Sequence, residues 1–113
     1  MITIAVVLDE LELLKSCDVR GHGGAGKRGN DIVCAAVSVL VRTAQSILSS
    51  REGIAARSEA GRRGEFSLET EALNKAGQDF LAAAGAFLVE GLASVAGEFP
   101  ENCSISITKE RRN

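Results

Sequence analysis

Two long segments with helical spacing of apolar residues limit most strongly what this chain can fold into. In the first, apolar side chains recur at three- and four-residue steps from residue 32 to about residue 49, which is the period of one helix face. The second shows the same spacing over residues 73–95, with Thr70 placed to cap it and Gly97 and Pro100 to end it. Both segments therefore predict amphipathic helices that each need a layer to cover.

That layer is predicted by five short runs of β-branched or alternating residues. They cover residues 2–8, 11–19, 54–58, 66–70 and 103–108. Asp9 and Glu10 would form the turn between the first two runs, and a segment containing Arg62 and Arg63 would join the next two. The order ββαββαβ predicts an α+β fold, in which a mostly antiparallel sheet carries both helices on one face.

The length and charge of the chain narrow its class. With 113 residues it can bury roughly two thirds of its unfolded surface, enough for a single domain over residues 1–113. A net charge of -2 argues against a general binder of nucleic acid or of anionic membranes. Arg42 and Glu90 keep either helix from reaching the roughly 18 apolar residues of a membrane span. Because only 4% of residues are aromatic, a homodimer that shares buried surface is expected.

The three cysteines point to a reducing compartment. Cys17, Cys34 and Cys103 are odd in number and widely spaced, unlike a disulfide framework or the paired cysteines of a zinc site. The N-terminal segment lacks the basic start of a signal peptide. We therefore expect a cytoplasmic protein without a metal or cofactor. A zinc site made of Cys17, His22 and Cys34 is a weak alternative, since the spacing matches no familiar ligand pattern.

Residues 21–27 match the first seven positions of the phosphate-binding loop GxxxxGK[ST]. However, Arg28 stands where the motif needs a hydroxyl for magnesium, and Gly29 and Asn30 should delay the next helix until about Asp31. The strand pattern also lacks the several parallel strands of a nucleotide-hydrolysing domain. Nucleotide or anion binding is therefore the third-ranked hypothesis.

A second chemistry pairs His22, the only histidine, with Cys34. If Asn30 or Asp31 caps the helix, Cys34 lies in the first turn, where free amides and the helix dipole favour a thiolate. That effect is worth about 0.3 to 1 kcal/mol, less than the about 1.4 kcal/mol of one pKa unit, so an imidazolium is also needed. From the local sequence alone, the small apolar residues after Cys34 favour an inert buried thiol.

A family resemblance favours the catalytic interpretation. Gly21-His22 is followed, after eleven residues, by Cys34 within the block 29–38, which reads GNDIVCAAVS. A weaker C-terminal match includes Gly91-Leu92 and Phe99-Pro100. In these features the chain resembles the Prp family of ribosomal-processing cysteine proteases. It departs from them after the histidine, where an alanine is usual and this chain has Gly23.

The resemblance implies a homodimeric cysteine protease in which Cys34 is the nucleophile and His22 the general base. The implied substrate is the N-terminal extension of large-subunit ribosomal protein twenty-seven, whose removal supports ribosome assembly. Peptide hydrolysis would proceed through a thioester. Backbone amides at the helix start, including that of Cys34, are the expected oxyanion donors.

Three further residues match family positions associated with the site, and each has a plainer alternative. Gly21 could let the loop turn beside substrate or simply end a strand. Asp31 could orient His22 or merely cap the helix. Ser38, four residues beyond Cys34, could bind the peptide or its own helix.

The remaining residues of interest receive structural interpretations. Cys17, Cys103, Phe80 and Phe87 are expected to pack in the core, and the arginines at 62–63 and 111–112 to be solvated in turns or a loose tail. The alternative function, from a different class, is a non-catalytic binding protein of the same fold that docks on ribosomal components.

Overall fold

The computed structural model describes residues 1–21, 28–61 and 64–113, with the backbone alone for residues 28–31. The elements in order are β1 Ile2–Leu8, β2 Leu14–Arg20, α1 Arg28–Ser49, β3 Ile54–Glu59, β4 Phe66–Ala72, α2 Lys75–Glu98 and β5 Cys103–Lys109. The predicted order ββαββαβ is confirmed.

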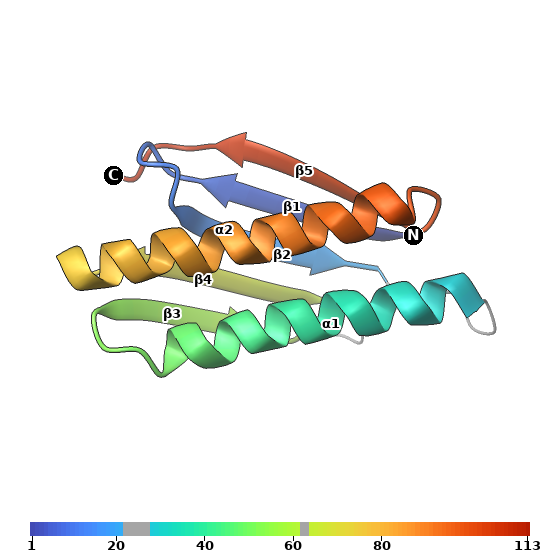
Figure 1. Cartoon of the computed structure of the whole chain (residues 1–113), viewed down its shortest axis with the longest axis horizontal. Coiled ribbons are helices and arrows are strands. Elements are labelled where there is room, and N and C mark those ends of the chain that lie inside the picture. Colours follow the sequence, from blue (N-terminus) through green and yellow to red (C-terminus); the bar gives the residue numbers. More distant parts are fainter. Residues whose placement is uncertain (22–27, 62–63) are drawn as a thin grey trace.

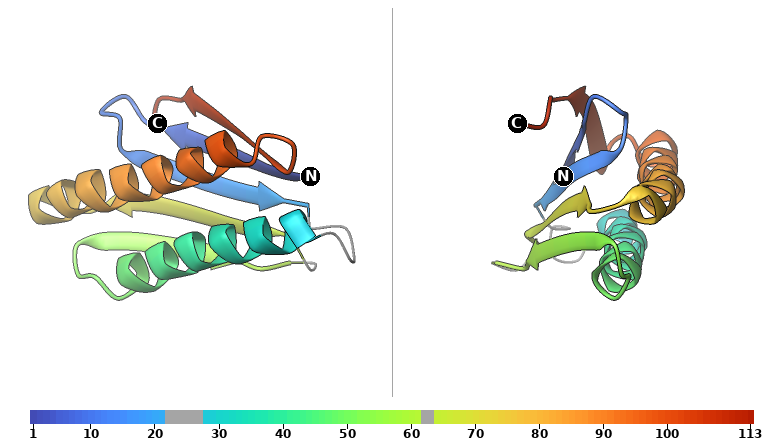
Figure 2. Two further views of the ribbon diagram at one scale, coloured as in Figure 1. Left: turned by 45° about the vertical axis from the view of Figure 1, so that its right-hand side comes forward. Right: turned by 90° about the vertical axis from the view of Figure 1, so that its left-hand side faces the viewer.

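The five strands form one sheet in the order β3-β4-β2-β1-β5. All neighbouring pairs are antiparallel except β1 and β5, which run parallel. The two helices lie side by side on one face of this sheet, and no helix of the described residues lies on the other face (Figures 1 and 2). The predicted α+β layer, mostly antiparallel and covered on one side, is therefore confirmed.

The core lies between the sheet and the two helices. Its largest fully buried hydrophobic side chains are Ile4, Val6, Leu14, Val33, Leu48, Leu68, Leu81, Leu88 and Leu92. Small residues let the layers approach closely: a Cβ built at Gly91 of α2 would come within 3.0 Å of the Leu40 side chain of α1. The small-residue helices thus offset the shortage of aromatic bulk by packing near to each other.

The turn between β1 and β2 is longer than predicted, because β2 begins at Leu14 and not at residue 11. Asp9 is buried, and its Oδ1 accepts hydrogen bonds from the amides of Leu11 and Leu13, each 2.9 Å long. Glu12 adopts a left-handed φ of 63° inside this turn. An aspartate that bonds the amide two residues ahead stabilises a turn, and here it holds Leu11 outside the strand.

α1 begins at Arg28, earlier than the predicted start near Asp31. Glycine in a helix costs only about 1 kcal/mol relative to alanine. The buried face of α1, which includes Val33, Val37 and Val41, is large enough to outweigh that cost at Gly29. The proposed N-caps Asn30 and Asp31 are therefore both inside the helix, and that prediction is wrong.

The start of α2 also differs from the prediction. Thr70 is no cap but a buried residue of β4, whose hydroxyl donates to the carbonyl of Leu14 at 2.7 Å. The N-cap is Asn74, whose side chain accepts a hydrogen bond from the amide of Gly77 at 2.8 Å. The predicted end is confirmed, because the helix stops at Glu98, just before the C-cap Phe99.

Phe87 is 75% exposed and lies outside the core in which it was predicted. Successive helical residues differ by about 100° in direction. Since the neighbouring Leu88 faces the sheet, Phe87 must point away from it. Phe80 is partly buried as expected, and its ring lies beneath the guanidinium of Arg51, 3.9 Å from centroid to Cζ.

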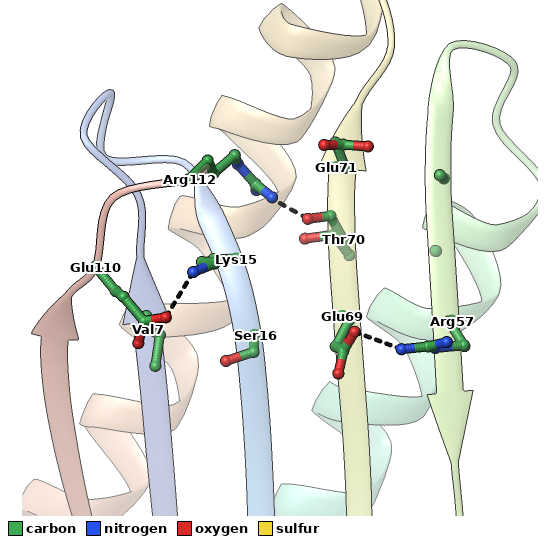
Figure 3. A pocket seen from close by; sticks show the side chains of 11 residues that line it. Val7, Lys15, Ser16, Arg57, Glu69, Thr70, Glu71, Glu110 and Arg112 are labelled. Atoms are coloured by element: carbon green, nitrogen blue, oxygen red, sulfur yellow. Dashed lines mark hydrogen bonds and ion pairs between the residues drawn. The ribbon is translucent and has the colours of Figure 1, made fainter.

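The C-terminal tail is fixed to the sheet, contrary to the prediction that Arg112 is solvated. The Nε of Arg112 donates to Oδ2 of the buried Asp9 at 2.6 Å. Its Nη2 donates to the carbonyls of Thr70 at 2.8 Å, drawn in Figure 3, and of Leu14 at 3.1 Å. The guanidinium therefore joins β4, the start of β2 and the first turn.

By length and composition alone, both helices could cross a membrane, because an 18-residue stretch of α1 and the whole of α2 each have a hydropathy of 1.7. Arg42 and Glu90 do not interrupt them enough to prevent this, so the sequence expectation was too strict. Helices that cover the sheet of a soluble protein pass the same test, which makes it weak support for a membrane location.

Candidate active site

A small pocket of about 100 Å³ lies where α1 passes the ends of β1, β2 and β4. Its walls include the apolar side chains of Ile2, Val19, Val37, Val41 and Phe66. Its chemically active or polar lining residues are Cys34, Ser38, Arg42 and Glu65, and Gly21 and Gly64 complete it. The pocket therefore combines an apolar floor with a thiol, a hydroxyl and two charged groups.

The pocket brings together three of the five predicted site residues, Gly21, Cys34 and Ser38. Cys34 is half-buried and Ser38 is exposed. The two side chains share one face of α1 because they are four residues apart. The Ser38 hydroxyl forms no hydrogen bond with the residues that the structure describes, its own helix included.

Cys34 lies deeper in α1 than the sequence suggested. It is the seventh residue of a helix that starts at Arg28, in the second turn. Only the first four amides of a helix lack an internal partner, and the dipole effect falls off within the first turn. The amide of Cys34 is therefore committed inside the helix, so its predicted role as an oxyanion donor is wrong.

Gly21 has a φ of 93°, directly after the last residue of β2. A Cβ at this position would overlap the main-chain oxygen of Met1. Both observations require glycine here, since other residues rarely adopt this conformation. Gly21 thus follows the end of β2 and forms part of the pocket wall.

The other two predicted site residues cannot be placed in the pocket. His22 lies outside the described residues. The backbone of Asp31 belongs to α1, and its side chain lies outside the described part. Arg62 and Arg63 also lie outside the described residues.

The two remaining thiols confirm their structural interpretation. Cys17 and Cys103 are buried in β2 and β5. Burial raises the pKa of the Cys17 thiol to about 12, with a smaller contribution from Asp18, and burial also raises the pKa of Cys103. Raised pKa values make both thiols poor nucleophiles at neutral pH, which leaves Cys34 as the accessible one.

A larger hollow of about 550 Å³ lies on the sheet face opposite the helices (Figure 3). Its charges are largely matched among themselves: Lys15 contacts Glu110 at 2.7 Å, and Arg57 contacts Glu69 at 2.8 Å. It contains none of the predicted site residues. Within residues 1–21, 28–61 and 64–113, no three His, Cys, Asp or Glu side chains are grouped to hold a metal.

One feature of the structure favours the nucleotide-binding hypothesis, and two others argue against it. Because α1 starts at Arg28, a helix does follow Lys27 at once, as a phosphate loop requires. Arg28 still replaces the magnesium-binding hydroxyl, and the described strands contain only one parallel pair, β1 with β5. The fold is therefore not that of a nucleotide-hydrolysing domain.

Sequence reasoning did not identify Arg42, Glu65 or Phe66 as pocket residues. Arg42 carried a usable signal, because it is eight residues beyond Cys34 and so falls on the same helix face. Glu65 and Phe66 carried no such sequence signal, since only the pairing of β4 with β2 brings them to the pocket.

The structure thus shows a small α+β protein with a half-buried thiol in a pocket. The family model described as "Cysteine protease Prp" matches residues 1–104. The chain therefore belongs to the Prp family of cysteine proteases, as the resemblance indicated.

Solved structures support the same fold. A structure of SMU.848 from Streptococcus mutans is 23% identical, with a TM-score of 0.77 over 97% of this chain and 96% of that one. The essential ribosomal processing protease Prp from S. aureus, with a covalently linked product peptide, is 19% identical. Its TM-score is 0.79 over 95% of this chain and 99% of that one. No curated protein matches the sequence.

Proposed function

We propose that this chain is a cytoplasmic cysteine endopeptidase that removes the N-terminal extension of large-subunit ribosomal protein twenty-seven. Membership of the Prp family supports protease activity. The observation that carries the proposal is that Cys34, half-buried, shares one pocket with Gly21 and Ser38. The S. aureus Prp structures with a substrate peptide and with a linked product peptide support a peptide as the ligand.

In the proposed reaction, His22 takes the proton of the Cys34 thiol, and the sulfur attacks the carbonyl carbon of the scissile bond. The protonated imidazole then gives that proton to the departing amine, which leaves a thioester on Cys34. Water hydrolyses the thioester, which releases the N-terminal fragment as a carboxylic acid and restores the thiol. Gly21, Asp31 and Ser38 support the substrate.

The test is cleavage of a peptide that spans the extension junction, followed by mass spectrometry. We expect the wild type to cut it and both Cys34→Ala and His22→Ala to lose activity by at least about a thousandfold. Cys103→Ala, which removes a buried thiol outside the pocket, is the matched control and should remain active if circular dichroism shows it folded. Equal cleavage by all four proteins, or by none, rejects the protease.

We further propose that the protein is a homodimer. Large apolar side chains are exposed on the helix layer, namely Ile32, Val39 and Ile47 on α1 and Phe87 on α2. Covering such side chains is the usual reason for a helix face to associate. Sedimentation should give a mass near twice that of one 11.8 kDa chain, and a monomer mass at micromolar concentration contradicts this part of the proposal.

A further inference from the structure

Arg42 is the one cation that lines the pocket of Cys34 among the described residues. The residue is exposed, and its guanidinium forms neither an ion pair nor a hydrogen bond with the described part of the chain. Two of the other described arginines do form ion pairs, Arg57 with Glu69 and Arg112 with Asp9. A guanidinium without an ion-pair partner among the described residues, in the same pocket as Cys34, is available for a ligand.

The position of Arg42 relative to Cys34 fixes which part of a peptide it can reach. The two Cα atoms are eight residues apart in α1, or about 12 Å along the helix axis. Helical side chains lean toward the N-terminus, so the long side chain of Arg42 covers the surface near Ser38. An extended peptide advances about 3.3 Å per residue. For a peptide that runs along α1 from Cys34, the guanidinium therefore lies roughly two to four residues from the cleaved bond.

We propose that Arg42 is a specificity-determining residue that binds the carboxylate of an aspartate or glutamate in the substrate, two to four residues from the cleaved bond. This inference rests on the proposed protease function. The planar guanidinium can donate two parallel hydrogen bonds to a carboxylate, which an ammonium cannot reproduce.

Glu65 confines this preference to one side of the pocket. It lies just before β4, on the wall formed by the sheet, whereas Arg42 belongs to α1. Glu65 likewise has no ion-pair partner among the described residues. A substrate carboxylate on the Glu65 side would meet a like charge, which is unfavourable. The acidic residue is therefore accepted at one substrate position, next to α1.

The experiment compares peptide pairs that are identical except for Glu or Gln at a single position, scanned over four residues on each side of the cleaved bond. For the wild type, kcat/KM should favour Glu at one position by about threefold to tenfold, the range of an accessible charge-assisted pair. Arg42→Gln should bring this ratio to about one, and Arg42→Glu should transfer the preference to Lys. Arg57→Gln, an exposed arginine remote from the pocket, is the control that keeps the wild-type ratio.

Sodium chloride provides a second measurement, because the Glu/Gln ratio should shrink as salt screens the pair. A ratio near one at every position in the wild type, or a ratio that survives Arg42→Gln, overturns the role of Arg42 while the protease function stands. A wild-type protein that cleaves no peptide of the scan overturns both proposals.

Discussion

Removing Arg112 tests how much the C-terminal tail contributes to stability. In the folded protein the side chain of Asp9 is 2% exposed and that of Arg112 is 21% exposed, with 2.6 Å between Nε and Oδ2. Arg112→Ala leaves the Asp9 carboxylate buried without its cation. It also removes the donors to the carbonyls of Leu14 and Thr70. The change is thus a loss of charge compensation more than a loss of packing.

The expected magnitude follows from burial. Removing one partner of a buried ion pair costs about 3 to 5 kcal/mol of the free energy of unfolding. The amides of Leu11 and Leu13 still donate to Asp9, and water can enter where the partly exposed Arg112 was. We therefore expect the lower end, about 3 kcal/mol, and a decrease in Tm of roughly 10 to 20 °C.

Urea denaturation followed by circular dichroism measures this loss. The control is Lys75→Ala, because Lys75 and Asp79 are also 2.6 Å apart but are 80% and 64% exposed. An exposed pair contributes about 0.5 kcal/mol or less. The double variant Asp9→Ala/Arg112→Ala should lose less than the sum of the two single variants, since it buries no lone charge. A loss for Arg112→Ala no larger than for Lys75→Ala, or strict additivity, would refute the reasoning.

The same pair predicts a pH dependence. Burial tends to raise the pKa of Asp9, but the hydrogen bonds from Arg112 and from the amides of Leu13 and Leu11 outweigh it and hold the pKa below its ordinary value of 3.8. A carboxyl with a lowered folded pKa adds stability above the ordinary value and loses it as the pH falls through the folded pKa. The stability gap between wild type and Arg112→Ala should therefore narrow when the pH is lowered from 7 to below 3.8.

Two further predictions use the same kind of contrast. Gly77→Ala should lower the free energy of unfolding by several kcal/mol in urea denaturation, because the new Cβ would overlap the carbonyl oxygen of Gly53. In Gly97→Ala the new Cβ meets nothing within 4 Å, so this variant should be more stable by about 0.5 to 1 kcal/mol. A loss of stability at both sites, or at neither, contradicts the packing argument. Limited alkylation with iodoacetamide, followed by peptide mass spectrometry, should label Cys34 well before the buried Cys17 and Cys103. Early labelling of Cys17 would show that β2 opens or that the argument from its raised pKa fails.

The element order could be predicted from the sequence because helical and strand periodicities follow each other without overlap. The positions that were mispredicted involve contacts between distant parts of the chain. Thr70 looks like a helix cap locally, but its hydroxyl bonds Leu14, which is 56 residues away. Arg112 looks like a solvated tail residue, but it pairs with Asp9, 103 residues away. Local propensity carries no information on either partner.

For the candidate site, the sequence predicted which residues meet better than how the thiol is activated. A start at Arg28 removes Cys34 from the first turn, so the helix amides and dipole that were expected to favour a thiolate act mainly on residues 28–31. The proposed mechanism must then rely on the imidazole. Gly21, which precedes His22 in the sequence, lines the pocket that holds Cys34. In the proposed enzyme, we therefore expect the imidazole of His22 to matter more for activating Cys34 than the helix start does.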